Sequence, residues 1–370
     1  MALIKRASLF CDRRQFGLIN FLAFKPSAMT MDLVTNPVLI NVTRSGLVES
    51  VHRGAVCVVD SEGDLVMATG DVSLPILPRS AIKPLQAIPF IETGAADIWK
   101  CSAEEIALAC ASHNADDVHL HTALGWINRL NLPEEALACG PQVPMGHMAR
   151  ERITASGETP TRLHNNCSGK HLGMVSTTLH MREPLEGYHR PDHPTQRRIQ
   201  KTLCEMMDVD LTVAPMAVDG CTAPCWGISL EALARGFARF ADPRGLSISR
   251  QSAIRRLKNA IAMHRELVAG ADRFDTALIT RKNYELVIKG GAEGVYAAAL
   301  PSFGLGVALK IDDGARRAAE VAIAALLRYL EVLDDADWEA LRSHVDPPIR
   351  NTVGDIVGQF EVAPNWLGGA

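Results

Sequence analysis

The order of strand-like and helix-like segments along the chain is the feature that most limits its fold. Short runs of β-branched and other apolar residues occur near both ends of the sequence, and helical periodicity fills most of the stretch between them. The segments that favour strands are Val38–Thr43, Ala55–Asp60, Asp64–Ala68, Glu285–Lys289, Val295–Ala299 and Gly304–Ile311. Early and late strands can share one sheet, which then needs helices to cover it. We therefore expect an α/β fold in which N- and C-terminal strands form an antiparallel sheet and a helical lobe is inserted between them.

Helical signals dominate the middle of the chain. Ser102 and Glu105 have the spacing of a capping box, which predicts a helix that runs on through Cys110. Further helices are expected near residues 115–130, 170–182, 194–207, 229–241 and 250–265, and a long amphipathic helix near 315–333 would cover one face of the sheet. These segments predict a single two-lobed catalytic domain over residues 34–370, with a helical lobe over about 84–283.

Composition excludes several functional classes. The chain has 38 Lys and Arg against 42 Asp and Glu, a net charge of −4, so it lacks the positive excess of a nucleic-acid-binding domain. Its apolar run over residues 16–24 follows basic residues as in a signal peptide, but it is shorter than the roughly 20 residues that span a bilayer. We interpret residues 1–33 as a disordered or mis-started N-terminal extension. The protein is expected to be cytoplasmic and to bind neither nucleic acid nor membrane.

Ser80 and Lys83 form the first candidate catalytic motif. Residues three apart on a helix project from the same face, so the two side chains are neighbours. A serine hydroxyl is a weak nucleophile until a base removes its proton, and a lysine can do so only when it is neutral. Burial and a second nearby cation both lower the pKa of a lysine. On its own the Ser-x-x-Lys spacing is common, and an exposed helix face is its usual meaning.

Two later motifs make the first one more specific. Ser112-His113-Asn114 follows the capped helix, and Lys289-Gly290-Gly291 ends a strand-like run. Taken singly, these are a helix cap and a hairpin turn. In this order, however, Ser-x-x-Lys, Ser-x-Asn and Lys-x-Gly are the motifs of serine β-lactamases and penicillin-binding proteins. The combination predicts a Ser/Lys acyl-transfer site, although Gly290 stands where the β-lactamase pattern has Thr, and the spacing is not that of class A.

The nine cysteines are an odd number without regular spacing, which argues against a disulfide framework. Four Cys and His residues instead fall in two short clusters with spacing that suits zinc. From spacing alone the ligands would be Cys167, His171, Cys221 and Cys225. Buried free thiols at a tight turn are an equally good interpretation.

Five segments together resemble the rhizobial-type L-asparaginases, the class 3 or asparaginase II-like enzymes, from about Asn36 onward. They are Arg79-Ser80-Ala81-Ile82-Lys83-Pro84, Ala109-Cys110-Ala111-Ser112-His113, Asn166-Cys167-Ser168-Gly169-Lys170-His171, Asp219-Gly220-Cys221 and Lys289-Gly290-Gly291-Ala292. The third of these is the most specific. The resemblance implies a serine β-lactamase-like fold, a homodimer, and hydrolysis of L-asparagine to L-aspartate and ammonia.

The resemblance also implies roles for individual residues. Ser80 matches the family's nucleophile and Lys83 its helix partner, while Ser112 and Lys289 match a second Ser–Lys pair. The metal position, where the family holds zinc in a supportive role, matches Cys167, Lys170 and Cys221 rather than the set derived from spacing. The remaining motif residues are candidates for substrate binding: Arg79, His113, Asn114, Asn166, Asp219, Gly290 and Gly291.

The motifs leave alternatives open. A glutaminase or another β-lactamase-like Ser/Lys acyl hydrolase would share them, because one extra methylene in a substrate changes discrimination by only about 1–3 kcal/mol. A non-catalytic zinc-dependent binding protein would need the thiols but not Ser80. Which Ser–Lys pair performs acylation also stays open, since two coupled pairs titrate together.

Overall fold

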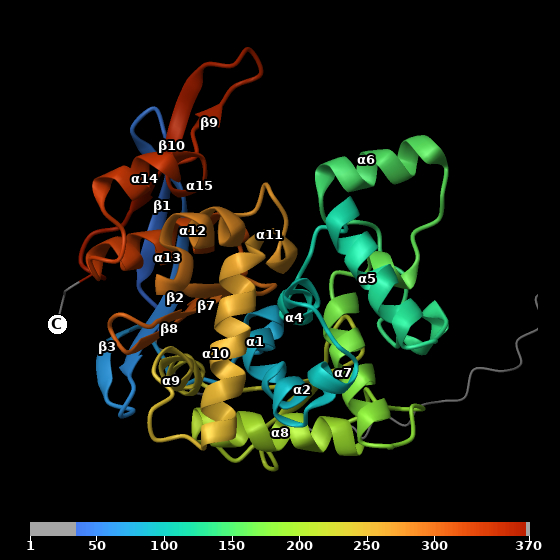
Figure 1. The fold of residues 1–370 in the computed structure, drawn as a ribbon. Helices are drawn as coiled ribbons and strands as arrows, with labels where there is room; N and C mark the ends of the chain where they lie inside the picture. The colour runs from blue at the N-terminus through green and yellow to red at the C-terminus, as the bar shows by residue number, and fades with distance from the viewer. Residues whose placement is uncertain (1–34, 368–370) are drawn as a thin grey trace, which may run out of the picture. The chain divides into compact units, whose positions relative to one another are not determined.

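An antiparallel sheet built from both ends of the chain lies at the centre of the structure. The computed structural model describes residues 35–367, so the expected extension at 1–33 lies outside the described residues. The sheet runs β6-β7-β8-β2-β1-β10-β9, with β3 also paired to β2. Its strands are β1 (Val38–Arg44), β2 (Leu47–Asp60), β3 (Leu65–Thr69), β6 (Val287–Gly290), β7 (Val295–Leu300), β8 (Leu305–Ile311), β9 (Ile349–Arg350) and β10 (Ile356–Val362). This topology confirms the predicted sheet of early and late strands (Figure 1).

The register of β2 joins the two halves of the chain. Val56 of β2 lies opposite Leu309 of β8, and on the neighbouring strand Ile40 of β1 lies opposite Val362 of β10. Every residue of β7 is buried, which shows that both faces of the sheet are covered there. The sheet is therefore a fully packed core at the strands that carry Lys289 and its neighbours.

Two helices of the described chain each pack across several strands of the sheet. They are α9 (Leu230–Ala241), which contacts β2, β7 and β8, and α13 (Arg316–Tyr329), which contacts β1, β7, β8 and β10. A Cβ at Gly306 of β8 would lie 2.0 Å from the Ala234 carbonyl oxygen of α9. Only glycine allows this close approach. Although α9 falls inside the sequence range expected for the helical lobe, it belongs to the layer that covers the sheet.

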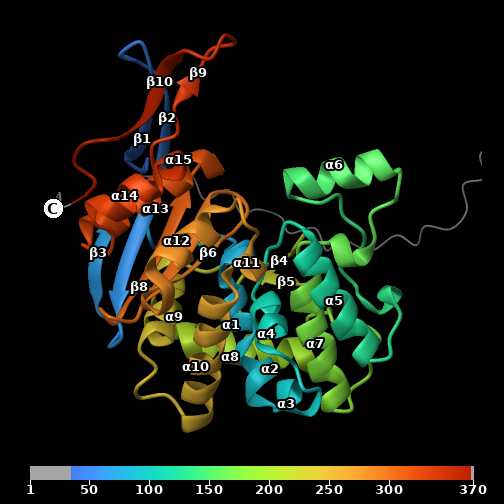
Figure 2. The same cartoon turned by 45° about the horizontal axis from the view of Figure 1, so that its top comes forward.

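Most of the other helices form the lobe beside the sheet (Figures 1 and 2). In this lobe α4 (Ala103–Ala109) begins with the predicted capping box of Ser102 and Glu105. A Cβ at Gly169 of α7 would lie 2.2 Å from the Leu108 carbonyl oxygen of α4, so glycine lets the two helices meet closely. The lobe contains α1 (Lys83–Gln86), α2 (Ile88–Glu92), α3 (Ala95–Ile98), α5 (Asp117–Arg129), α6 (His147–Ser156), α7 (Ser168–His180), α8 (Pro194–Met207), α10 (Ile248–Met263), α11 (Arg265–Val268) and α12 (Phe274–Lys282).

Several short elements were not expected from the sequence. The hairpin β4 (Met216–Val218) and β5 (Pro224–Trp226) carries the Asp219-Gly220-Cys221 segment in its turn. After α13, the chain adds α14 (Asp335–Ala340), α15 (Arg342–Val345) and the strands β9 and β10. No residue of β10 is fully buried, so its apolar pattern is too weak to predict. Among the described residues, no helix is long and apolar enough to cross a membrane.

Candidate active site

Ser80 lies in a tight turn that leads into α1. The turn spans Arg79–Ile82 as a 3₁₀ helix, and Lys83 begins α1 directly after it. Arg79 has a φ of 51°, which is unfavourable for a residue with a Cβ. Its Nε donates to Asp219 Oδ1 at 2.6 Å, and this ion pair holds the turn against the β4–β5 hairpin. The turn that carries Ser80 is thereby tied to a second segment of the chain.

Ser112 stands next to Ser80. It follows the end of α4, and its backbone N–H donates to the Val268 carbonyl at 2.9 Å. The Ser112 hydroxyl lies 3.4 Å from the Ser80 hydroxyl, and Asn166 Nδ2 donates to Ser112 Oγ at 3.3 Å. The predicted motifs around Ser80, Ser112 and Asn166 are thus in contact.

Lys83 is buried behind the two serines. Its ammonium group donates to the Ala111 carbonyl at 2.5 Å, directly before Ser112 in the chain. Only 1% of Lys83 is exposed, so its charge is removed from water. Within residues 35–367, neither Lys83 nor Lys289 donates a hydrogen bond to a serine hydroxyl. Both lysines instead use backbone carbonyls as acceptors.

Lys289 forms a fully buried ion pair with Asp275. Their charged atoms are 3.7 Å apart and both side chains are 0% exposed. Burial, helped by the positive charges of Lys83 and Arg273 and opposed by Asp275, lowers the pKa of Lys289 to about 8. Burial alone would raise the pKa of Asp275, but the adjacent cations hold it below its usual value. Near pH 8 this site can therefore hold a neutral amine.

The two glycines after Lys289 bring this strand end against the Ser80 turn. A Cβ at Gly291 would lie 2.8 Å from the Pro78 carbonyl oxygen and 3.0 Å from the Ala81 nitrogen. A Cβ at Gly290 would lie 2.9 Å from the Tyr296 ring. Close packing, against backbone at Gly291 and against the Tyr296 ring at Gly290, is thus the physical reason for glycine at both positions of this motif.

A cavity of about 370 Å³ opens in front of Ser80, which is the size of a small-molecule site. Nine of the predicted site residues line it: Arg79, Ser80, Ser112, Asn166, Cys167, Asp219, Cys221, Gly290 and Gly291. Lys83, Lys170 and Lys289 are buried and are not part of the lining. The cavity therefore presents the serine hydroxyls and keeps the lysine amines away from bulk water.

His113 and Asn114, which were predicted to bind substrate, are not part of the cavity lining. His113 is fully buried, and its Nε2 lies 2.9 Å from the Ser168 hydroxyl, while its Nδ1 accepts from the Ala115 N–H. Burial lowers the pKa of His113 well below its usual value, so the ring is neutral. Asn114 is 2% exposed and uses its amide to hold Asp272 and Arg273. Both residues support the site from behind its wall.

Two thiols and a carboxylate gather at one end of the cavity. The ligand atoms of Cys167, Asp219 and Cys221 all lie within 4.8 Å of one another. The Lys170 ammonium donates to Cys221 Sγ at 3.0 Å. The structure thus brings together the predicted ligands Cys167, Lys170 and Cys221 and adds the carboxylate of Asp219. Thiolate, amine and carboxylate donors in this number fit the tetrahedral preference of Zn²⁺.

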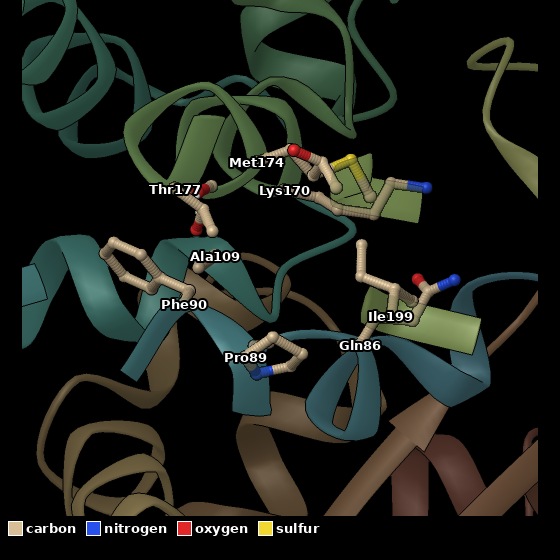
Figure 3. Close-up of a pocket in the computed structure, with 11 residues that line it drawn as sticks. Gln86, Pro89, Phe90, Ala109, Lys170, Met174, Thr177 and Ile199 are labelled. Carbon is tan, nitrogen blue, oxygen red and sulfur yellow. Dashed lines mark hydrogen bonds between the residues drawn. The ribbon is translucent and has the colours of Figure 1, made fainter. Parts of the chain in front are cut away.

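Charges in this cluster are strongly coupled. A hydrogen bond with Cys167 and the charge of Lys170 hold the pKa of Cys221 well below its usual value. Burial lowers the pKa of Lys170, but the facing thiolate more than offsets this effect and raises it. In Figure 3 the aliphatic part of Lys170 lies beside Met174 in a small cavity behind the site, and its ammonium group points away from Phe90.

Comparison with known proteins identifies a family. The sequence matches the family model described as L-asparaginase II over residues 40–362. The chain belongs to the L-asparaginase II family. No curated protein matches this family member at a significant level.

Solved structures with a similar arrangement share little sequence with this asparaginase-family chain. A proposed beta-lactamase from Bacteroides dorei DSM 17855 has 10% identity and a TM-score of 0.41, covering 74% of this chain and 93% of its own. The structure titled Mglu in its native form has 12% identity and a TM-score of 0.45, covering 81% and 70%. A beta-lactamase from Mycobacterium bovis has 13% identity and a TM-score of 0.39, covering 74% and 94%.

The asparaginase-family site also contains residues that no sequence motif indicated. Arg273, Glu293, Tyr296 and Arg316 line the cavity, and Asp275 lies behind it against Lys289. A buried lysine requires a compensating negative charge. This requirement was the one indication in the sequence that an acidic residue such as Asp275 lies beside Lys289. The sequence could not say which of its many acidic residues supplies that charge.

Proposed function

We propose that this protein hydrolyses L-asparagine to L-aspartate and ammonia through a covalent acyl-enzyme on Ser80. The observation that carries the proposal is Ser80 at the wall of the cavity, with its hydroxyl 3.4 Å from that of Ser112 and two buried lysines nearby. Ser80 attacks the side-chain amide carbon, ammonia leaves, and water then cleaves the resulting β-aspartyl ester. Family membership supports an amidohydrolase, and this arrangement supports the serine route.

The lysine pair acts as the general base. Lys83 and Lys289 influence each other, and the positive charge of Lys83 contributes to the low pKa of Lys289. Lys289 loses its proton near pH 8, after which the site can accept the proton of Ser80. Ser112 lies between the catalytic hydroxyl and the amide of Asn166, where it passes a proton to the departing ammonia.

Backbone N–H groups stabilise the oxyanion that forms on the amide carbonyl. The N–H of Gly290 donates to Asp275 and that of Gly291 donates to Val295, so both are already occupied. We assign the role to the N–H groups of Ser80 and Ala292, two residues of the cavity lining. Such donors contribute roughly 3–4 kcal/mol to the transition state.

The thiol cluster supplies a zinc site beside the substrate. Cys167 and Cys221 would hold the ion, with Asp219 and Lys170 completing the donor set. When bound, Zn²⁺ would supply positive charge that orients the substrate. Asp219 would connect this cluster to the catalytic turn, because its other carboxylate oxygen binds Arg79.

The experiment that tests the proposal is ammonia release from L-asparagine by the wild-type protein and by Ser80→Ala, each with and without added Zn²⁺. We expect Ser80→Ala to lose activity to below a few per cent, while the exposed control Ser156→Ala keeps it. Activity in Ser80→Ala at the wild-type level would contradict the acyl-enzyme. Parallel assays with L-glutamine and a chromogenic β-lactam separate the asparaginase from a glutaminase and from a β-lactamase.

Two further proposals concern the protein in the cell. The eight cysteines in the described part of the chain are free thiols, which supports a reducing, cytoplasmic location. The family resemblance supports a homodimer, which light scattering on the purified protein tests directly.

A further inference from the structure

Arg273 stands out among the arginines that line the cavity. Arg79 is ion-paired with Asp219 at 2.6 Å, and Arg316 is ion-paired with Glu320 at 2.6 Å. Within residues 35–367, no carboxylate oxygen lies within 4.0 Å of the Arg273 guanidinium. Asp275 feels the charge of Arg273 only from beyond this distance, so Arg273 brings a positive charge without a direct ion pair to the wall of the cavity.

The guanidinium of Arg273 is buried and incompletely hydrogen-bonded. Only 8% of the residue is exposed, and within the described part of the chain its Nε has no hydrogen-bond partner. A buried cation without a direct ion pair is unfavourable unless something compensates its charge. A planar guanidinium suits one kind of partner best, since its parallel N–H groups match the two oxygens of a carboxylate.

The protein holds Arg273 in place from behind. Its NH1 group donates to Asn114 Oδ1 at 3.2 Å, and Asn114 Nδ2 donates to Asp272 Oδ1 at 2.5 Å, which fixes the orientation of the amide. Two glycines make room for Asn114: a Cβ at Gly270 would lie 2.2 Å from Asn114 Nδ2, and one at Gly146 would lie 2.8 Å from Asn114 Cβ. A cation positioned this firmly at a cavity wall is built to receive an anion.

We propose that Arg273 binds the α-carboxylate of the substrate and so restricts the enzyme to amides that carry a free α-carboxylate. This inference rests on the proposed amidohydrolase function, because Arg273 and Ser80 line the same cavity. Asn114 is then a positioning residue that acts through Arg273. The Ser112-His113-Asn114 motif would serve both ends of the substrate, with Ser112 at the reacting amide and Asn114 behind the carboxylate site.

The test compares L-asparagine with 3-aminopropanamide, which has the same amide and amine but lacks the carboxylate. For Arg273→Met we expect kcat/KM for L-asparagine to fall about 100-fold, which corresponds to ~2.8 kcal/mol at 1.4 kcal/mol per tenfold. The value for 3-aminopropanamide should change less than threefold. Arg256→Met is the matched control, because Arg256 is ion-paired with Asp97 and does not line this cavity.

A binding measurement separates this inference from the catalytic proposal. In the Ser80→Ala background, calorimetry of L-asparagine should show binding that Arg273→Met weakens by a similar factor and that Arg273→Lys weakens less. An equal loss for both amides in Arg273→Met would overturn the carboxylate role and indicate an electrostatic effect on Lys289 instead. If the wild-type protein releases no ammonia from either amide, the proposed function fails. The carboxylate role of Arg273 is then tested by comparing the binding of L-aspartate with that of β-alanine, which lacks the α-carboxylate.

Discussion

Removing the charge of Asp275 should move the pH dependence of the reaction. Asp275→Asn keeps the side-chain shape and an oxygen that can still accept from the Gly290 N–H, but it removes the counter-ion of Lys289. At 3.7 Å and an effective dielectric constant of about 20, the lost attraction is about 4 kcal/mol, or about three pH units as an upper limit. Relaxation around the buried amine reduces this limit, so we expect the pKa of Lys289 to fall by about one to three pH units.

The assay is kcat/KM for ammonia release from L-asparagine between pH 5 and about 10, which reports ionisations of the free enzyme. The wild-type acid limb should have its midpoint near the Lys289 pKa of about 8, and the Asp275→Asn limb should lie at lower pH. Asp210→Asn, at an exposed position, is the control and should leave the limb in place. An unchanged acid limb in folded Asp275→Asn would refute the assignment of this ionisation to the lysine pair.

The ionisation of Lys289 also makes the free energy of unfolding depend on pH. The pKa of Lys289 is about 8 in the folded protein and near its ordinary 10.5 in the unfolded chain, so the unfolded state binds more protons between these values. The contribution of Lys289 to the free energy of unfolding therefore rises as the pH increases from about 8 to 10.5. Denaturant unfolding of the wild type and of Lys289→Met across this window should differ in slope, since the methionine variant cannot titrate there.

Three further predictions follow from the packing and the thiol cluster. Cys221→Ser should lower the zinc content measured by mass spectrometry to well below one ion per chain, whereas Cys204→Ser, away from the cluster, should leave it unchanged. Gly291→Ala should lower kcat at least tenfold with a smaller effect on KM, because its Cβ would push the strand end from the Ser80 turn; wild-type kcat would contradict this role. Gly306→Ala should lower the free energy of unfolding by about 1–3 kcal/mol or more in urea, and a neutral result would show that α9 can move away from the sheet.

The sequence predicted the arrangement of the fold better than the details of the site. Strand runs such as Val295–Ala299 are wholly buried, and the Ser102–Glu105 capping box is a strong local signal, so both appear in the structure close to their predicted places. The strand β10 was missed because its half-exposed residues have no clear alternation of apolar and polar side chains. Local pattern predicts an element only where burial imposes a period on the sequence.

Among the site residues, short motifs predicted those that act through local geometry. Ser80 and Lys83 share one turn, and the glycines after Lys289 permit a close approach, which are properties visible in a few consecutive residues. Asp275 acts through its contact with Lys289 on the next strand, and Arg273 acts through Asn114, which is 159 residues away along the chain. Because such pairings depend on tertiary packing, no spacing rule could have identified them.

The pairing of β1 with β10 constrains how the protein can be synthesised. Ile40 lies opposite Val362, and the Ala363 N–H donates to the Leu39 carbonyl. The strand β1 therefore pairs with a strand that is translated much later, β10. During translation the edge of β1 stays open while nearly all of the chain emerges, and an open strand edge is prone to pair with other chains. A chain truncated just before β10 would leave that edge unpaired permanently, although it would still contain both site serines and the lysines buried behind them.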